Sequence, residues 1–185
     1  SRNSIFAGML PSEIEKHYKQ YWVYDNQKEG KNNYERELLD LQIKRTLREE
    51  IKMDYIKVTN IGVAKDLNDN IQNYLNNDLT VIVYNFIDFL SHARTEMEVL
   101  KELASDEKAY RSITKSWFEN SSLWSALKKL DGKNFQLIIG TDHGTIRVAQ
   151  PSRVVGDRDT TTNLRYKEGR NLQYERKDVL EIKKP

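Results

Sequence analysis

The stretch from Leu79 to His92, L-T-V-I-V-Y-N-F-I-D-F-L-S-H, decides the fold. Residues 79–86 are dominated by apolar, β-branched and aromatic side chains, and Asp78 bounds them on the N-terminal side. A run of this length and composition is typical of a buried strand in a parallel sheet. Asp88 and His92 follow the run. Because open α/β sheets carry their ligand sites at strand ends, the stretch predicts a core strand that leads into a polar site.

A second stretch repeats this pattern. Residues 135–139, F-Q-L-I-I, predict another buried strand, and G-T-D-H-G follows at 140–144. Asp142 and His143 therefore follow their predicted strand, just as Asp88 and His92 follow the first one. The chain has only three histidines, and two of them occupy these two places. This coincidence is the strongest functional signal in the sequence.

Length and composition indicate one globular domain. The 185 residues are 38% hydrophobic and 31% charged, which suits a packed core. The net charge of +2 is close to balance, so bulk charge does not demand a nucleic acid or an anionic membrane as partner. The absence of cysteine excludes disulfides, Cys-ligated zinc and a Cys nucleophile, and it is compatible with the expected cytoplasmic location. No apolar stretch approaches the ~18 residues that would predict a membrane span.

The middle of the chain predicts a β-α-β unit. An alternating strand at 54–61, an amphipathic helix at 64–75 and the strand that begins at Leu79 are expected to give two parallel strands. Near the N-terminus, Ser12 is expected to cap a helix that reaches Trp22, with Glu15 completing a capping box. The other expected helices are 33–47, 96–103, 106–119 and 123–130, and the other expected strands are 145–148 and 178–182.

The two Asp-His pairs have the chemistry of metal ligands. Carboxylate oxygens and neutral imidazole nitrogens bind zinc, and mixed N/O sets also suit manganese and iron. Two such metals about 4 Å apart form the clamp that phosphatases and nucleases use. Two side chains per metal fall short of the three or four that zinc takes from a protein. Asp157 and Asp159 are candidates to complete the set, as are ligands outside this chain. The alternative is a metal-free structural domain whose Asp-His pairs only form hydrogen bonds within loops.

Longer motifs carry a resemblance to a known family. D-x-x-x-H after one strand and T-D-H-G after the next are similar to the alkaline phosphatase superfamily. The PglZ branch is the closer match, and within it the output domain of PorX-type response regulators of the Bacteroidetes type IX secretion system. The resemblance covers residues 1–185 and is carried by four segments: Y-N-F-I-D-F-L-S-H-A-R-T-E at 84–96, A-Y-R-S-I-T-K-S-W-F at 109–118, T-D-H-G-T-I-R-V at 141–148 and V-V-G-D-R-D-T-T-T-N-L-R-Y-K-E-G-R-N-L at 154–172.

The resemblance implies a doubly wound, mostly parallel sheet flanked by helices, with two zinc ions. Asp88 and His92 would bind one ion, and Asp142 and His143 would help to bind the other. The implied activity is phosphodiester hydrolysis, with oligonucleotides as substrates. The family's nucleophilic Thr has no counterpart in the sequence and is expected upstream of Ser1. Residues 1–185 are therefore expected to be the central part of the domain, without a receiver domain and inactive alone, although a genuine short domain is the alternative.

Partners also follow from the resemblance. It implies a sensor kinase, a sigma factor and a possible homodimer, with no membrane. A basic segment is a candidate for contacts with substrate phosphates, because clustered Arg and Lys supply such affinity; its residues are Arg158, Arg165, Lys167 and Arg170. The alternative for this segment is a solvated loop in which acidic neighbours balance the charge. The alternative for the whole domain is a non-catalytic signalling module that binds a partner such as a sigma factor.

Overall fold

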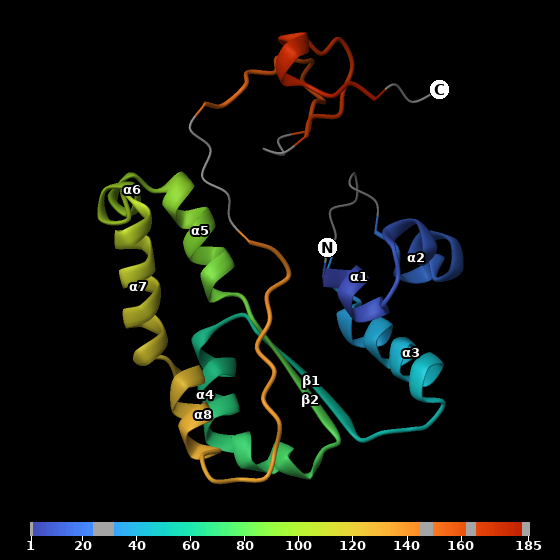
Figure 1. Cartoon of the computed structure of the whole chain (residues 1–185), viewed down its shortest axis with the longest axis vertical. Helices are drawn as coiled ribbons and strands as arrows, with labels where there is room; N and C mark the ends of the chain where they lie inside the picture. Colours follow the sequence, from blue (N-terminus) through green and yellow to red (C-terminus); the bar gives the residue numbers. More distant parts are fainter. Residues whose placement is uncertain (1, 24–31, 145–149, 162–165, 183–185) are drawn as a thin grey trace. The chain divides into compact units, whose positions relative to one another are not determined.

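The computed structural model describes residues 2–23, 32–144, 150–161 and 166–182 (Figure 1). The side chains of His92, of residues 94–96 and of Lys101 lie outside this description. The chain forms two compact units, Ser1–Asp142 and His143–Pro185. The boundary falls inside the T-D-H-G motif, so each unit is considered by itself.

The first unit is built on a small parallel sheet, which makes the fold α/β. Strand β1 (Met53–Val58) pairs with β2 (Leu79–Tyr84), in a register that matches the two strands residue by residue. Helix α4 (Ile61–Asn70) and the 3-10 helix η2 (Ile71–Asn76) connect them. The predicted β-α-β unit with parallel strands is therefore confirmed, although both strands end earlier than the sequence pattern indicates.

One face of the sheet carries the main apolar core of this unit. Helix α4 and helix α8 (Ser122–Lys129) lie on this face (Figure 1). Side chains that alternate along the strands reach it, as the two-residue repeat of a strand requires. The buried members of the core are Val58, Ala64, Leu67, Ile71, Ala126 and Leu130, with Ile56, Val63, Tyr74, Leu75, Ile82 and Tyr84 packed against them.

The opposite face of the sheet contacts helices α1 (Arg2–Ala7) and α3 (Glu35–Leu47). Tyr55 of β1 points to this side, where its ring meets that of Phe6 edge-on at 5.6 Å between centroids. Single side chains of α1 and α3, Phe6 and Glu35, therefore contact β1 from this side.

The first long helix starts one residue earlier than expected. Helix α2 (Pro11–His17) begins with Pro11, and the N-cap residue is Leu10. The Leu10 amide donates to Glu13 Oε2 at 2.7 Å, so the expected cap built on Ser12 and Glu15 is wrong. Proline suits this first position because its fixed φ is helical and its missing N–H would have no helical partner. The helix stops at His17, and the 3-10 helix η1 (Lys19–Tyr21) replaces the rest of the predicted helix.

Helices α6 (Glu98–Leu103), α7 (Glu107–Glu119) and α8 follow β2 close to their predicted positions, whereas α5 (Phe86–Glu96) was not predicted and begins where the strand was expected to end. Asp106 caps α7 through the amide of Ala109, and Ser121 caps α8 through the amide of Trp124. Capping side chains satisfy amides that have no partner within the helix, which fixes where each helix begins. The ring of Phe86 stacks on Trp117 with 3.8 Å between centroids and so ties α5 to α7.

The predicted strand at 135–139 is not formed. The segment is irregular, and Ile138 and Ile139 are 83% and 77% exposed. A strand requires backbone partners as well as apolar side chains, and no described strand pairs with this segment. The strand predicted at 178–182 is also wrong, because a 3-10 helix η3 (Arg176–Asp178) leads into irregular chain. The strand predicted at 145–148 lies outside the described residues.

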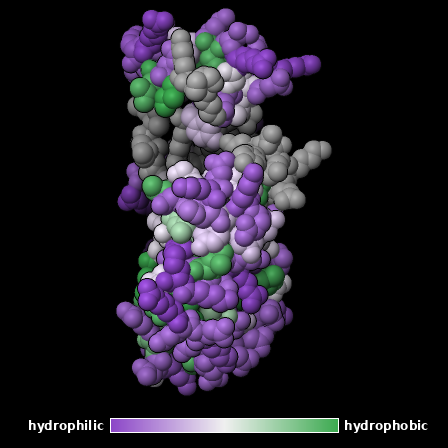
Figure 2. Space-filling model, turned by 90° about the vertical axis from the view of Figure 1, so that its right-hand side faces the viewer, coloured by the Kyte–Doolittle hydropathy of each residue, from purple (hydrophilic) through white to green (hydrophobic). Residues whose placement is uncertain are grey.

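The second unit has little regular structure in its described part. A single antiparallel bridge joins Val155 to Gln173, with hydrogen bonds of 3.0 and 2.7 Å. Among the described helices of the two units, none is long and apolar enough to cross a membrane. The face drawn in Figure 2 is mostly hydrophilic and carries apolar residues in separate patches.

Candidate functional site

The candidate site starts where β2 ends. The strand stops at Tyr84, Asn85 occupies the N-cap position of α5, and Asp88 lies exposed in the first turn of that helix. The sequence predicts Asp88 and His92 directly behind a strand that runs to Phe86. The structure instead places both on helix α5, and the side chain of His92 lies outside the described part.

Arg2 brings the second predicted carboxylate to this place. Arg2 Nη1 donates to Asn85 Oδ1 at 2.5 Å, and Arg2 Nε lies 3.8 Å from Asp142 Oδ2. One guanidinium therefore contacts both the residue at the start of α5 and the Asp of the T-D-H-G motif. The two runs that the sequence pairs by pattern thus end close to each other.

A buried carboxylate holds Arg2 from the other side. Glu35, in the first turn of α3, has a side chain that is only 1% exposed. Its Oε1 lies 2.8 Å from Arg2 Nε, and its Oε2 lies 3.0 Å from Lys57 Nζ. The hydroxyl of Tyr55 donates to the same Oε2. A buried charge is tolerated when it is paired and hydrogen-bonded. Glu35 is paired with Arg2 of α1 and Lys57 of β1, and its hydrogen bond comes from Tyr55, while Arg2 Nε and Glu35 Oε1 make no hydrogen bond.

Tyr55 is fixed as a donor by its surroundings. Burial raises the pKa of the Tyr55 hydroxyl, and the hydrogen bond to the Glu35 carboxylate raises it further. A phenol with a raised pKa keeps its proton at neutral pH and can donate only to an acceptor. The hydrogen bond to Glu35 is therefore present across the physiological pH range.

His143 lies exposed in the second unit, and its ring nitrogen Nδ1 is 3.2 Å from the carbonyl oxygen of Gly144. A carbonyl oxygen only accepts, so Nδ1 carries the proton in this contact. In a neutral imidazole that tautomer places the lone pair on Nε2. Metal-binding histidines commonly donate their other nitrogen to a carbonyl in this way. The local geometry of His143 therefore fits a metal ligand.

The donor types fit zinc, but the described side chains do not complete a site. Asp88 and Asp142 offer carboxylate oxygens and His143 an imidazole, a mixed N/O set that suits zinc. Among the described residues, no three His, Asp or Glu side chains come close enough together to hold a metal ion. The imidazole of His92, which the family resemblance adds to the set, lies outside the described part. Asp157, a candidate for completing the set, accepts a hydrogen bond from Asn171 Nδ2 at 2.9 Å.

The basic segment belongs to the second unit. Arg158 and Arg170 are exposed and Lys167 is half-buried, whereas Arg165 lies outside the described residues. Hydrogen bonds between residues 161 and 168 hold the two sides of this segment together at 2.9 and 3.0 Å. Of the described cations, Arg158 and Arg170 are therefore open to solvent, and Lys167 is partly so.

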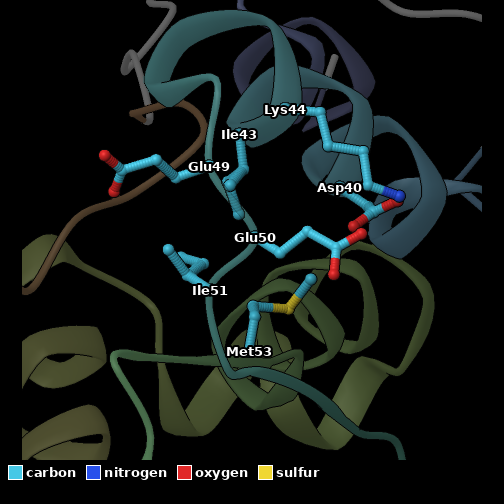
Figure 3. A pocket seen from close by; sticks show the side chains of 7 residues that line it. All are labelled: Asp40, Ile43, Lys44, Glu49, Glu50, Ile51 and Met53. Carbon is cyan, nitrogen blue, oxygen red and sulfur yellow. The ribbon is translucent and has the colours of Figure 1, made fainter.

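Two cavities lie elsewhere on the first unit. One, of about 220 Å³, is drawn in Figure 3, where the Glu50 carboxylate points toward Lys44 and Asp40 while Glu49 points away. The hydrogen bond to Asp40 raises the pKa of Lys44. The other, of about 380 Å³, borders the buried Glu35; its lining residues are Asn32, Asn33, Glu35, Arg36, Glu37, Tyr55 and Lys57. Neither cavity contains a predicted site residue.

Comparison with known proteins gives the family. The family described as the BREX system PglZ alkaline phosphatase-like domain matches residues 1–185. The chain belongs to the PglZ family. Membership of this alkaline-phosphatase-like family points to a phosphoesterase-type function. Among curated proteins, none matches the chain.

The residues that organise the site of this PglZ domain are absent from the sequence predictions. Arg2, Glu35 and Asn85 lie far apart along the chain, and no spacing rule links them. Glu35 gives no sequence signal, because it is one of several charged residues in its helix. The structure distinguishes it as the one carboxylate among the described residues that is completely buried.

Proposed function

We propose that this PglZ domain binds zinc at the carboxyl end of β2 and acts on phosphodiesters, with oligonucleotides as the substrates. The observation that carries the proposal is the double contact of Arg2 with Asn85 and Asp142, at 2.5 and 3.8 Å. It joins the segment before Asp88 to the T-D-H-G motif at the end of a parallel strand, where α/β sheets carry their sites. Membership of an alkaline-phosphatase-like family supports the reaction class.

The proposed ligands are the four residues of the two Asp-His pairs. Asp88 and His92 would hold one zinc ion, and Asp142 and His143 would help to hold a second. Bound zinc supplies a Lewis acid for phosphoryl oxygens and lowers the pKa of a coordinated hydroxyl or water. The contact of His143 Nδ1 with the carbonyl oxygen of Gly144 would help to orient the imidazole.

Substrate phosphates are proposed to contact the basic segment. Arg158 and Arg170 are exposed, and Lys167 is half-buried on the same segment. Arg165 belongs to the proposal through the sequence alone. Such cations give an affinity for phosphodiester backbones that falls as salt rises. We therefore expect the affinity for oligonucleotides to fall as salt is added. In Arg158→Ala this fall should be smaller.

We place the domain, by its sequence motifs, with PorX-type response regulators of type IX secretion. This assignment brings with it a sensor kinase, a sigma factor and possible dimerisation as proposed partners. The family resemblance assigns no nucleophile to residues 1–185, so metal binding and phosphate binding test the proposal more directly than turnover does.

The test is the zinc content of the purified chain, measured by elemental analysis after dialysis against buffered zinc. We expect bound zinc in the wild-type chain and a clear loss in Asp88→Ala. The control is Asp131→Ala, because Asp131 is an exposed carboxylate in the turn after α8. Absence of zinc from the wild-type chain, or equal zinc in the Asp88→Ala variant, would contradict the proposal and favour a metal-free domain.

A further inference from the structure

The side chain of Arg2 is held in one orientation by groups from three parts of the fold. Its Nε lies 2.8 Å from the buried Oε1 of Glu35, which belongs to α3. Its Nη1 donates to Asn85 at the end of β2, and its Nε also faces Asp142 at 3.8 Å. The Arg2 side chain is itself only 16% exposed. A charged group so placed has lost most of its water, and its partners replace it.

The partners of Glu35 make this orientation rigid. Lys57 Nζ lies 3.0 Å from Glu35 Oε2 and also donates to the Asn32 carbonyl at 2.7 Å. The Tyr55 hydroxyl occupies the same carboxylate oxygen. Both residues stand on β1, so the carboxylate is anchored to the sheet. Glu35 therefore holds Arg2 at a fixed position relative to the strands.

The guanidinium geometry suits a bridging role. Its planar fork of donors can address separate acceptors at defined angles, whereas the ammonium of lysine is a point charge on a flexible stem. Arg2 Nη1 donates a hydrogen bond to Asn85, whereas Nε faces both carboxylates as an ion pair without a hydrogen bond. A lysine at this position would keep the charge but could not reproduce all three contacts.

We propose that Arg2 is a positioning residue, which holds the start of α5 and the Asp142 segment at a fixed separation so that Asp88 and Asp142 face one site. This inference rests on the proposed function, because it assigns Arg2 the task of orienting the proposed ligands. Groups that orient ligating carboxylates act in this way, and their loss typically costs about 10–100-fold in metal affinity.

The test compares Arg2→Lys with Arg45→Lys in the full chain. Arg45 is a matched control because its Nη2 donates to the Ala7 carbonyl at 2.6 Å and so links α3 to α1, as Arg2 does. Among the described residues, Arg45 hydrogen-bonds to Ala7 and Met9, which belong neither to the end of β2 nor to the T-D-H-G motif. Both substitutions keep the positive charge, so the comparison isolates the contacts with Asn85 and Asp142.

Two measurements are made on each variant. The first is hydrogen–deuterium exchange of the peptide that covers Asn85–Leu90, in which the amide of Phe89 makes the first α5 hydrogen bond, to the Asn85 carbonyl at 3.0 Å. The second is zinc affinity by competition with a chromophoric chelator. We expect Arg2→Lys to speed exchange in this peptide and to weaken zinc binding by about 10–100-fold, with Arg45→Lys close to wild type.

The outcomes separate the two proposals. Zinc binding by the wild-type chain with no loss in Arg2→Lys overturns the positioning role and leaves the proposed function intact. Equal losses in both variants also overturn it, because the effect would then come from general docking of α1. If the wild-type chain binds no zinc, the proposed function fails. In that case the hydrogen–deuterium exchange data by themselves test the positioning role of Arg2. Unchanged exchange in Arg2→Lys would overturn it.

Discussion

Glu35 is expected to be the most costly single polar side chain to remove from the first unit. Glu35→Ala would leave Arg2 and Lys57 close together without the carboxylate between them. Breaking a buried ion pair by removing one partner costs about 3–5 kcal/mol. The two cations are 16% and 27% exposed, so water can offset part of the loss. We therefore expect the free energy of unfolding to fall by about 2–4 kcal/mol.

The size of this effect separates Glu35 from the exposed carboxylates. Asp40 pairs with Lys44 at 2.8 Å on the same helix, but the two side chains are 47% and 53% exposed. Exposed i,i+4 pairs contribute only about 0.3–0.5 kcal/mol, so Asp40→Ala serves as the control. Glu35→Gln keeps an acceptor for the Tyr55 hydroxyl, and we expect it to fall between Glu35→Ala and the control.

Urea unfolding followed by tryptophan fluorescence measures the difference. With a denaturant slope of about 2 kcal/mol per molar, the expected loss moves the unfolding midpoint of Glu35→Ala down by about 1–2 M. The slope itself should not change, since both variants expose similar surface on unfolding. A midpoint for Glu35→Ala within the shift of Asp40→Ala would refute the view that Glu35 is the buried anchor of the Arg2 network.

Three further predictions concern single side chains. The folded-state pKa of Tyr55 is raised, so its protonated form contributes stability that is fully present below about pH 10 and is lost as the pH rises above that value. The urea midpoint of Tyr55→Phe should therefore fall less steeply at alkaline pH than the wild-type midpoint does. Ser121→Ala removes the acceptor of the Trp124 amide at 3.1 Å, and thermal unfolding should show a loss of about 1 kcal/mol, with Ser121→Asp retaining most of the wild-type stability. Ile138 is 83% exposed, so Ile138→Ser should lower the free energy of unfolding, measured from the urea midpoint, by less than about 0.5 kcal/mol. If Ile138 belonged to a core strand, the same substitution would lower it several times more.

The sequence predicted the sheet where local pattern and neighbouring elements agree. Residues 79–84 form a half-buried strand, and the helix at 61–70 returns the chain to pair it in parallel with residues 53–58. The same reasoning failed for residues 135–139, which have the composition of a strand but no described partner. Composition reports which side chains avoid water, but it does not report which backbone will supply the hydrogen bonds.

The candidate site was predictable in its ligands but not in its support. Asp88 and Asp142 stand out because each follows an apolar run and is itself followed by a histidine. Arg2 and Asn85 are 83 positions apart, and their contact exists only because the fold brings α1 to the end of β2. Glu35 gives no sequence signal either, since a glutamate in the first turn of a helix is ordinarily an exposed residue that favours the helix dipole.

The most direct test of the central claim is X-ray absorption spectroscopy at the zinc edge of the zinc-loaded chain. A site built from the two Asp-His pairs predicts a first shell of nitrogen and oxygen at about 2.0–2.1 Å, with the outer scattering of imidazole. His143→Ala should reduce the imidazole contribution while leaving the fold unchanged by circular dichroism. A zinc shell without imidazole, or one that His143→Ala leaves unaltered, would contradict the assignment of this site.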